Sequence, residues 1–178
     1  MKQILFYDPA TGRGISTAKG QAQFLPDSTP ESPHIETSEV IENPVDWIVA
    51  NGVVSRAVIV TKQMVDEERD RRIAAGFMFN GKMIDFDQSS KENVTGAGAL
   101  AMGAVAMGAV AGDLYWHGGP EPFSWITADN TKLELDAASM FSMSQAAGNH
   151  VTAHFMAGRA LKDFTTIPAT YADDDWWP

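Results

Sequence analysis

The sequence predicts an α+β fold: a β-rich N-terminal arm, followed by short β-hairpins that alternate with three helices. Two Asn-Gly pairs, at residues 51–52 and 80–81, lie between short apolar stretches, as in tight hairpins. Three longer stretches each begin at a residue that can cap a helix. The order of these elements lacks the strand–helix–strand rhythm of a parallel sheet.

Residues 1–60 are expected to form the β-rich arm. Residues 2–7 (KQILFY) have the composition of a short strand, and the Pro and Gly of residues 8–12 favour a turn after it. Residues 26–33 (PDSTPESP) contain three prolines, which cannot donate ladder hydrogen bonds, so they are expected to form an extended linker. A hairpin with its turn at residues 51–52 completes the arm.

The first helix is predicted to begin after Thr61, whose hydroxyl can cap it, and to end near Gly76. Its acidic and basic residues are interleaved, which is typical of an exposed, ion-paired face. Two pairs at i,i+4 spacing are expected: Glu67–Arg71 and Glu68–Arg72.

The second helix is predicted to follow a hairpin over residues 76–87, with Ser89 or Ser90 as its cap. It contains a perfect repeat, AMGAV, at residues 101–105 and 106–110. A period of five residues moves around a helix, so small residues occur on every side. We therefore expect this helix to pack centrally.

A third hairpin is predicted from residues 123–127 and 132–135, and Asp136 is placed to cap a long last helix. That helix extends through Leu161 by its apolar spacing. The remaining residues, 166–178, form an acidic tail rich in tryptophan.

Short motifs follow one another in a distinctive order between residues 60 and 164. They are Arg72-Ile73-x-x-Gly76-Phe77, Asn80-Gly81-Lys82, Phe86-Asp87-Gln88-Ser89-Ser90, Asn93-Val94-Thr95-Gly96 and Trp125-Ile126-Thr127-Ala128-Asp129-Asn130. This order resembles an uncharacterised domain found in many proteins of the tail and tail-fibre region of tailed bacteriophages. The resemblance implies a phage tail-type domain at residues 61–165, with residues 1–60 as an attachment region.

The setting that this resemblance implies is the virion tail, and the host cytoplasm during assembly. We expect a non-enzymatic structural component of the tail, at the tail tip, the baseplate or a fibre attachment, that contacts other phage tail proteins. Tail components are commonly symmetric, so a homo-oligomer is expected, with a trimer favoured by analogy. Two alternatives stay open: an assembly chaperone of a tail fibre that is absent from the finished particle, and a small envelope-degrading hydrolase.

Composition excludes several classes of protein. The net charge of −10 makes the surface repel phosphate, so nucleic acid is not an expected partner. The chain has no cysteine, which excludes disulfides and thiolate metal sites. Residues 94–112 carry no charge, but they are mostly Ala and Gly, which favour membrane insertion only weakly. A tightly packed helix is therefore predicted there, and no membrane span.

No catalytic residue, cofactor or metal site is predicted. His150 and His154 are spaced i,i+4, as two zinc ligands can be, but the sequence offers no obvious third ligand. Asp85, Asp87 and Ser89 alternate like the start of a calcium loop, but the glycine and the closing glutamate of such a loop are missing.

Five aromatic residues are candidates for contact with a partner: Trp176, Trp177, Phe6, Tyr7 and Trp47. Adjacent tryptophans are unfavourable in water unless they dock, and tryptophan is common among the residues that dominate interfaces. The sequence leaves two alternatives for the tail pair. Trp176 and Trp177 either anchor a partner or fold back onto their own domain.

Overall fold

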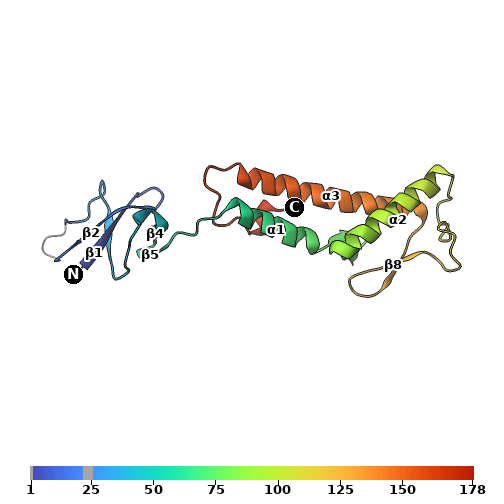
Figure 1. The fold of residues 1–178 in the computed structure, drawn as a ribbon, viewed down its shortest axis with the longest axis horizontal. Coiled ribbons are helices and arrows are strands. Elements are labelled where there is room, and N and C mark those ends of the chain that lie inside the picture. The colour runs from blue at the N-terminus through green and yellow to red at the C-terminus, as the bar shows by residue number, and fades with distance from the viewer. Residues whose placement is uncertain (1, 22–25) are drawn as a thin grey trace. The chain divides into compact units, whose positions relative to one another are not determined.

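A computed structural model describes residues 2–21 and 26–178 (Figure 1). The chain divides into two compact units, Met1–Ile59 and Val60–Pro178. Small antiparallel sheets occur in both, and the helices alternate with hairpins, which confirms the predicted α+β fold. The acidic tail belongs to the second unit.

The first unit consists of two antiparallel sheets. Its elements are β1 (Lys2–Tyr7), β2 (Gly14–Gly20), β3 (His34–Thr37), the short helix η2 (Pro44–Asp46), β4 (Trp47–Ala50) and β5 (Val53–Arg56). Strand β1 lies between β2 and β3, and β4 pairs with β5 around Asn51 and Gly52. Both turn residues have positive φ, which Asn and Gly accept more readily than other residues. The core contains Leu5, Ile41 and Trp47.

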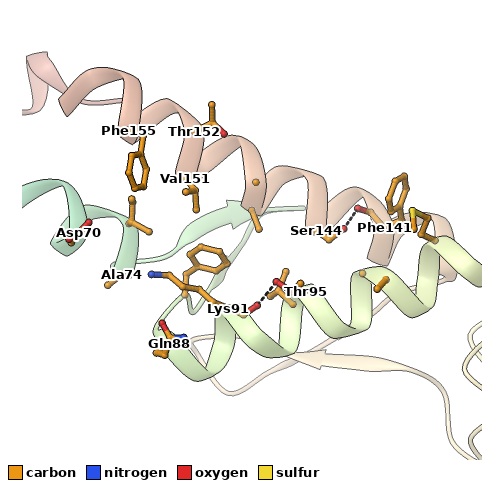
Figure 2. Close-up of a pocket in the computed structure, with 18 residues that line it drawn as sticks. Asp70, Ala74, Gln88, Lys91, Thr95, Phe141, Ser144, Val151, Thr152 and Phe155 are labelled. Carbon is orange, nitrogen blue, oxygen red and sulfur yellow. Dashed lines mark hydrogen bonds between the residues drawn. The ribbon is translucent and has the colours of Figure 1, made fainter. Parts of the chain in front are cut away.

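In the second unit, helices alternate with hairpins (Figure 1). Its elements are α1 (Lys62–Ala74), β6 (Phe77–Phe79), β7 (Lys82–Ile84), α2 (Gln88–Ala106), β8 (Ser124–Ile126), β9 (Lys132–Glu134), α3 (Ala137–Lys162) and the short helix η3 (Asp174–Trp176). Helix α3 packs against both α1 and α2 (Figures 1 and 2). Among the described residues, no helix is long and apolar enough to span a membrane.

A side chain caps the N-terminus of each of α1, α2 and α3. Thr61 and Asp136 act as predicted, and each accepts the backbone N–H three residues later, at 3.2 and 2.8 Å. The prediction of Ser89 or Ser90 for α2 was wrong, because the cap is Asp87, which accepts the Ser90 N–H at 2.8 Å. Both serines lie inside the first turn, where their backbone is already helical.

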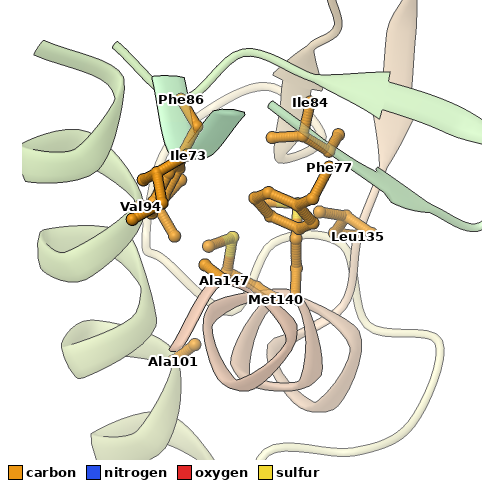
Figure 3. Close-up of a cluster of buried hydrophobic side chains, with 10 residues drawn as sticks. Ile73, Phe77, Ile84, Phe86, Val94, Ala101, Leu135, Met140 and Ala147 are labelled. Atoms are coloured by element: carbon orange, nitrogen blue, oxygen red, sulfur yellow. The ribbon is translucent and has the colours of Figure 1, made fainter. Parts of the chain in front are cut away.

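The main core of the second unit lies where α2, α3 and the two hairpins meet (Figure 3). Met140 and Met143 of α3 are fully buried there, as is Ile84 of β7. The ring of Phe77 meets that of Phe86 edge to face, with 5.4 Å between the ring centroids. The apolar residues of the hairpins thus cover one side of α3 and hold the helices in place.

Helices α2 and α3 approach closely at Gly98 and Ser144. A Cβ atom on Gly98 would overlap the Ser144 side chain, so only glycine permits this approach without movement of the helices. The second helix, which was expected to pack centrally, packs against α3 through Val94, Gly98 and Ala101, but most of its AMGAV repeat stays outside the core. Ala101 is buried, but α2 ends at Ala106 within the repeat, and Met107 is 88% exposed.

The charged face of α1 differs in one pair from its prediction. Arg72 pairs with Glu68 at 2.6 Å, as predicted, but Arg71 also pairs with Glu68, at 2.6 Å, and not with Glu67. Glu67 instead accepts a hydrogen bond from Gln63 at 2.8 Å. The hydrogen bond from Arg71, followed by that from Arg72, lowers the pKa of the Glu68 carboxyl below its ordinary value.

Candidate functional site

An open groove of about 1010 Å³ crosses the second unit (Figure 2). Its lining residues come from residues 70–74 of α1, 88–102 of α2 and 141–155 of α3, together with Phe86. We call it the helix groove. Its floor is the outer side of the main core, formed by Ile73, Val94 and Ala147.

The α2 wall of the helix groove has small residues in its middle and longer side chains at its ends. Lys91, Thr95, Gly98 and Met102 line it at successive spacings of four, three and four residues, together with Ala99. These spacings place the residues in one stripe along the helix. The side chains of the α2 wall therefore project least into the groove at its middle and furthest at its ends.

The α3 wall also has small residues in its middle, with phenylalanine rings at its two ends. Phe141, Ser144, Gly148, Val151 and Phe155 line it at spacings of three, four, three and four residues. The ring of Phe155 is 49% exposed. This wall therefore offers aromatic and branched side chains to whatever enters the groove.

Charge is confined to one end of the helix groove. Among its described lining residues, only Asp70 of α1 and Lys91 of α2 are charged. Asp70 pairs with Arg69 at 2.8 Å, and the Arg69 guanidinium lies 4.3 Å from the centroid of the Phe155 ring. The Lys91 ammonium lies 5.5 Å from the centroid of the Phe86 ring and forms no ion pair within the described part of the chain.

The tail tryptophans fold back onto the second unit, which is one of the two alternatives that the sequence left open. Trp177 is only 7% exposed and belongs to a small core with Val65 and Leu161. Its indole N–H donates a hydrogen bond to the Tyr171 carbonyl at 2.8 Å. Trp176 is half-buried, so of the pair it retains more surface for a partner.

The three interface candidates of the first unit differ in exposure. Trp47 is 7% exposed and belongs to the core of that unit, so its side chain offers little surface to a partner. Phe6 and Tyr7 at the end of β1 are half-buried, and the Phe6 ring packs against that of His34 at 5.2 Å between centroids. Phe6 and Tyr7 stay candidates for contact with a partner.

His150 and His154 lie inside the second unit, between its two cores. The Nε2–H of His150 donates to the Ile73 carbonyl at 3.2 Å, and the Nδ1–H of His154 donates to the His150 carbonyl at 2.8 Å. The His154 ring stacks on Trp177 at 6.2 Å between centroids. Nowhere in the described part of the chain do three potential ligands gather around a metal site.

Burial, the largest cause, lowers the pKa of His150 below its ordinary 6.5, and the nearby His154 and Lys91 act in the same direction. A histidine whose pKa falls on folding favours the folded state at neutral pH, and this contribution is lost as the pH falls below 6.5. We expect His150→Gln to show a smaller loss of melting temperature between pH 7.5 and pH 5 than the wild type. His117 is exposed, so His117→Gln should keep the wild-type difference, and an equal difference in all three proteins would contradict the assignment.

Asp85, Asp87 and Ser89, whose spacing resembles the start of a calcium loop, lie at the end of a hairpin and at the cap of α2. The Asp87 carboxylate accepts hydrogen bonds from the Ser90 N–H and the Ser89 hydroxyl, at 2.8 and 2.9 Å. These hydrogen bonds lower the pKa of Asp87, with the backbone N–H of Ser90 as the largest cause. The alternation of Asp85, Asp87 and Ser89 is thus explained by local structure.

Together, the fold and the groove define an α+β protein whose helical unit carries an open, mostly apolar groove. The chain belongs to the family described as "Domain of unknown function (DUF4376)", which matches residues 56–176. No curated protein and no solved structure matches the chain. The family description names no function, so the phage-tail setting stays a prediction.

Proposed function

We propose that the chain is a structural component of a bacteriophage tail, at the tail tip, the baseplate or a fibre attachment, and that it acts as a homo-oligomer through protein contacts. The observation that carries this proposal is the exposed apolar surface of the second unit. It consists of the helix groove and of exposed apolar residues on α2, including Leu100, which is 69% exposed. Exposed apolar patches of this kind are typical of protein contact sites.

The tail setting is supported by the order of motifs between residues 60 and 164, which resembles a domain of phage tail and tail-fibre proteins. The proposed attachment role of the first unit has separate support. Strand β3 is an edge strand of its sheet, with β1 on one side. The backbone groups of an edge strand can pair with a strand of another protein.

Quantitative mass spectrometry of purified phage particles tests the proposal. We expect peptides of this chain in particles from the source of the sequence, in a fixed and small ratio to the other tail proteins. The major capsid protein serves as an internal reference for particle number. Absence from particles, with abundance in infected cells, would overturn the structural role and favour an assembly chaperone.

A further inference from the structure

We propose that a pocket beside β8 binds an extended peptide segment of another protein, which adds a strand to the free edge of β8. The pocket has a volume of about 430 Å³ and shares no lining residue with the helix groove. It is lined by Asp85, by Ser90, Asn93 and Ala97 of α2, and by residues 123–126. We call it the β8 pocket. The inference rests on the proposal that the chain acts through protein contacts, and it names the kind of partner.

The first support is the free edge of β8, which pairs with β9 alone. Along an antiparallel pair, residues alternate between those that exchange hydrogen bonds with the partner strand and those that do not. The Leu135 N–H donates to the Phe123 carbonyl at 3.2 Å, so the backbone of Trp125, two residues further on, also faces β9. The backbone groups of Ser124 and Ile126 therefore face away from β9, and no residue of β9 lines the pocket.

These edge groups determine what kind of molecule the β8 pocket accepts. Ser124 and Ile126 each offer one backbone N–H donor and one backbone C=O acceptor. An extended peptide presents the same groups in alternation, with a rise of about 3.3 Å per residue. A helix uses its backbone groups internally and cannot pair with them. The edge of β8 thus favours an extended peptide, bound by strand addition.

The second support is that the edge is held in place without a partner. The Phe123 N–H donates to the Leu114 carbonyl at 2.7 Å before β8 begins, and the Ala128 N–H donates to the Met83 carbonyl at 3.0 Å beyond its end. The Phe123 ring also packs against that of Trp116, with 4.8 Å between the ring centroids. Binding therefore has to order mainly the peptide, which lowers its entropic cost.

The third support is the chemistry of the side chains around the edge. Asp85 is the one charged residue among the described lining residues, and it forms no ion pair within the described part of the chain. The Asn93 amide and the Trp125 indole N–H have no hydrogen-bond partner there either. The side chain of Ile126 is 53% exposed. The β8 pocket thus favours a peptide with a basic residue and an apolar residue, and the net charge of −10 acts in the same direction.

Nuclear magnetic resonance of the isotope-labelled full chain tests the inference. The probe is a capped synthetic peptide of alternating valine and threonine with a lysine at each end. We expect it to shift the backbone amide signals of Ser124 and Ile126, with a dissociation constant on the order of 0.1–1 mM. The same peptide with every internal amide N-methylated keeps its side chains but cannot pair as a strand. It should bind at least about tenfold more weakly.

A matched pair of variants tests the role of the edge. Ile126→Pro removes an outward N–H that makes no hydrogen bond to β9, a position at which a strand tolerates proline. It should weaken peptide binding by about tenfold or more, whereas Ile126→Thr, which keeps the N–H, should change it by less than about threefold. Thermal unfolding followed by circular dichroism checks that both variants are folded. Asp85→Asn should weaken binding by roughly two- to fivefold, through loss of the attraction to lysine.

Four results would overturn the inference: no binding at peptide concentrations up to about 5 mM, equal binding of the N-methylated peptide, equal affinities of Ile126→Pro and Ile126→Thr, or signal shifts confined to β3. An unchanged affinity of Asp85→Asn would overturn the preference for a basic peptide. The comparison of the two peptides uses the wild-type chain, so it decides the matter even if Ile126→Pro does not fold. None of these results decides whether the chain is present in phage particles, which the particle analysis measures separately.

Discussion

Replacement of Trp177 by alanine is expected to lower the free energy of unfolding of the second unit by about 3–5 kcal/mol, the usual cost of removing a buried tryptophan. The indole ring is almost fully buried in the smaller core, against Val65 and Leu161. The substitution also removes the hydrogen bond to the Tyr171 carbonyl and the contact with the Arg72 guanidinium, which lies 5.4 Å from the ring centroid. Denaturant unfolding, followed by far-UV circular dichroism of the helices, measures the change.

Trp176→Ala is the matched control for this prediction. Trp176 is half-buried, and its indole N–H donates a longer hydrogen bond, 3.3 Å, to the Thr170 hydroxyl. Its loss should cost less than half as much as the loss of Trp177. Equal costs for the two variants, or a cost below about 1 kcal/mol for Trp177→Ala, would contradict the docked position of the tail.

Gly98→Ala is expected to destabilise the second unit by about 1–3 kcal/mol, the usual cost of overpacking. The new methyl group would overlap the Ser144 side chain, so α2 and α3 would have to separate at this close contact. This effect opposes the intrinsic preference of helices, in which alanine is better than glycine by about 1 kcal/mol. The free energy of unfolding from denaturant titration therefore gives the balance of the two effects.

Gly96→Ala, in the same helix, is expected to change the free energy of unfolding in the opposite direction. A methyl group on Gly96 would have no heavy atom within 4 Å outside its own surroundings in the helix. It should stabilise the protein by about 0.5–1 kcal/mol, because only the helix preference remains. If both variants stabilised the protein, the close approach of α2 and α3 at Gly98 would be refuted.

Local sequence predicted most of the elements of this fold. Thr61 and Asp136 cap their helices, and the Asn-Gly pairs at 51–52 and 80–81 form hairpin turns, because caps and tight turns depend on a few neighbouring residues. Where two local candidates competed, the prediction failed. Asp87 caps α2, whereas Ser89 or Ser90 was expected to do so.

Long-range features were harder to predict. The burial of Trp177 depends on α1 and α3, which are distant in sequence, and nothing in residues 166–178 distinguishes a docked tryptophan from an exposed one. The AMGAV repeat has no helical period, so it could not indicate that α2 ends at Ala106.

The helix groove was not predicted, although the residue spacings of its two walls can be read from the sequence. The residues of each wall recur at spacings of three and four, for example Phe141, Ser144, Gly148, Val151 and Phe155. Such a stripe alone is equally typical of a buried core face. Only the crossing of α2 and α3 leaves the two stripes facing one open space.

The methionines of this chain differ in how easily an oxidant can reach them. With no cysteine in the sequence, methionine is the side chain most readily oxidised, by conversion of its thioether to a polar sulfoxide. Met140 and Met143 are fully buried, whereas Met102 at the margin of the helix groove is exposed, and Met107 just beyond α2 more so. Oxidative damage would therefore change the surface of the helix groove well before it reached the core.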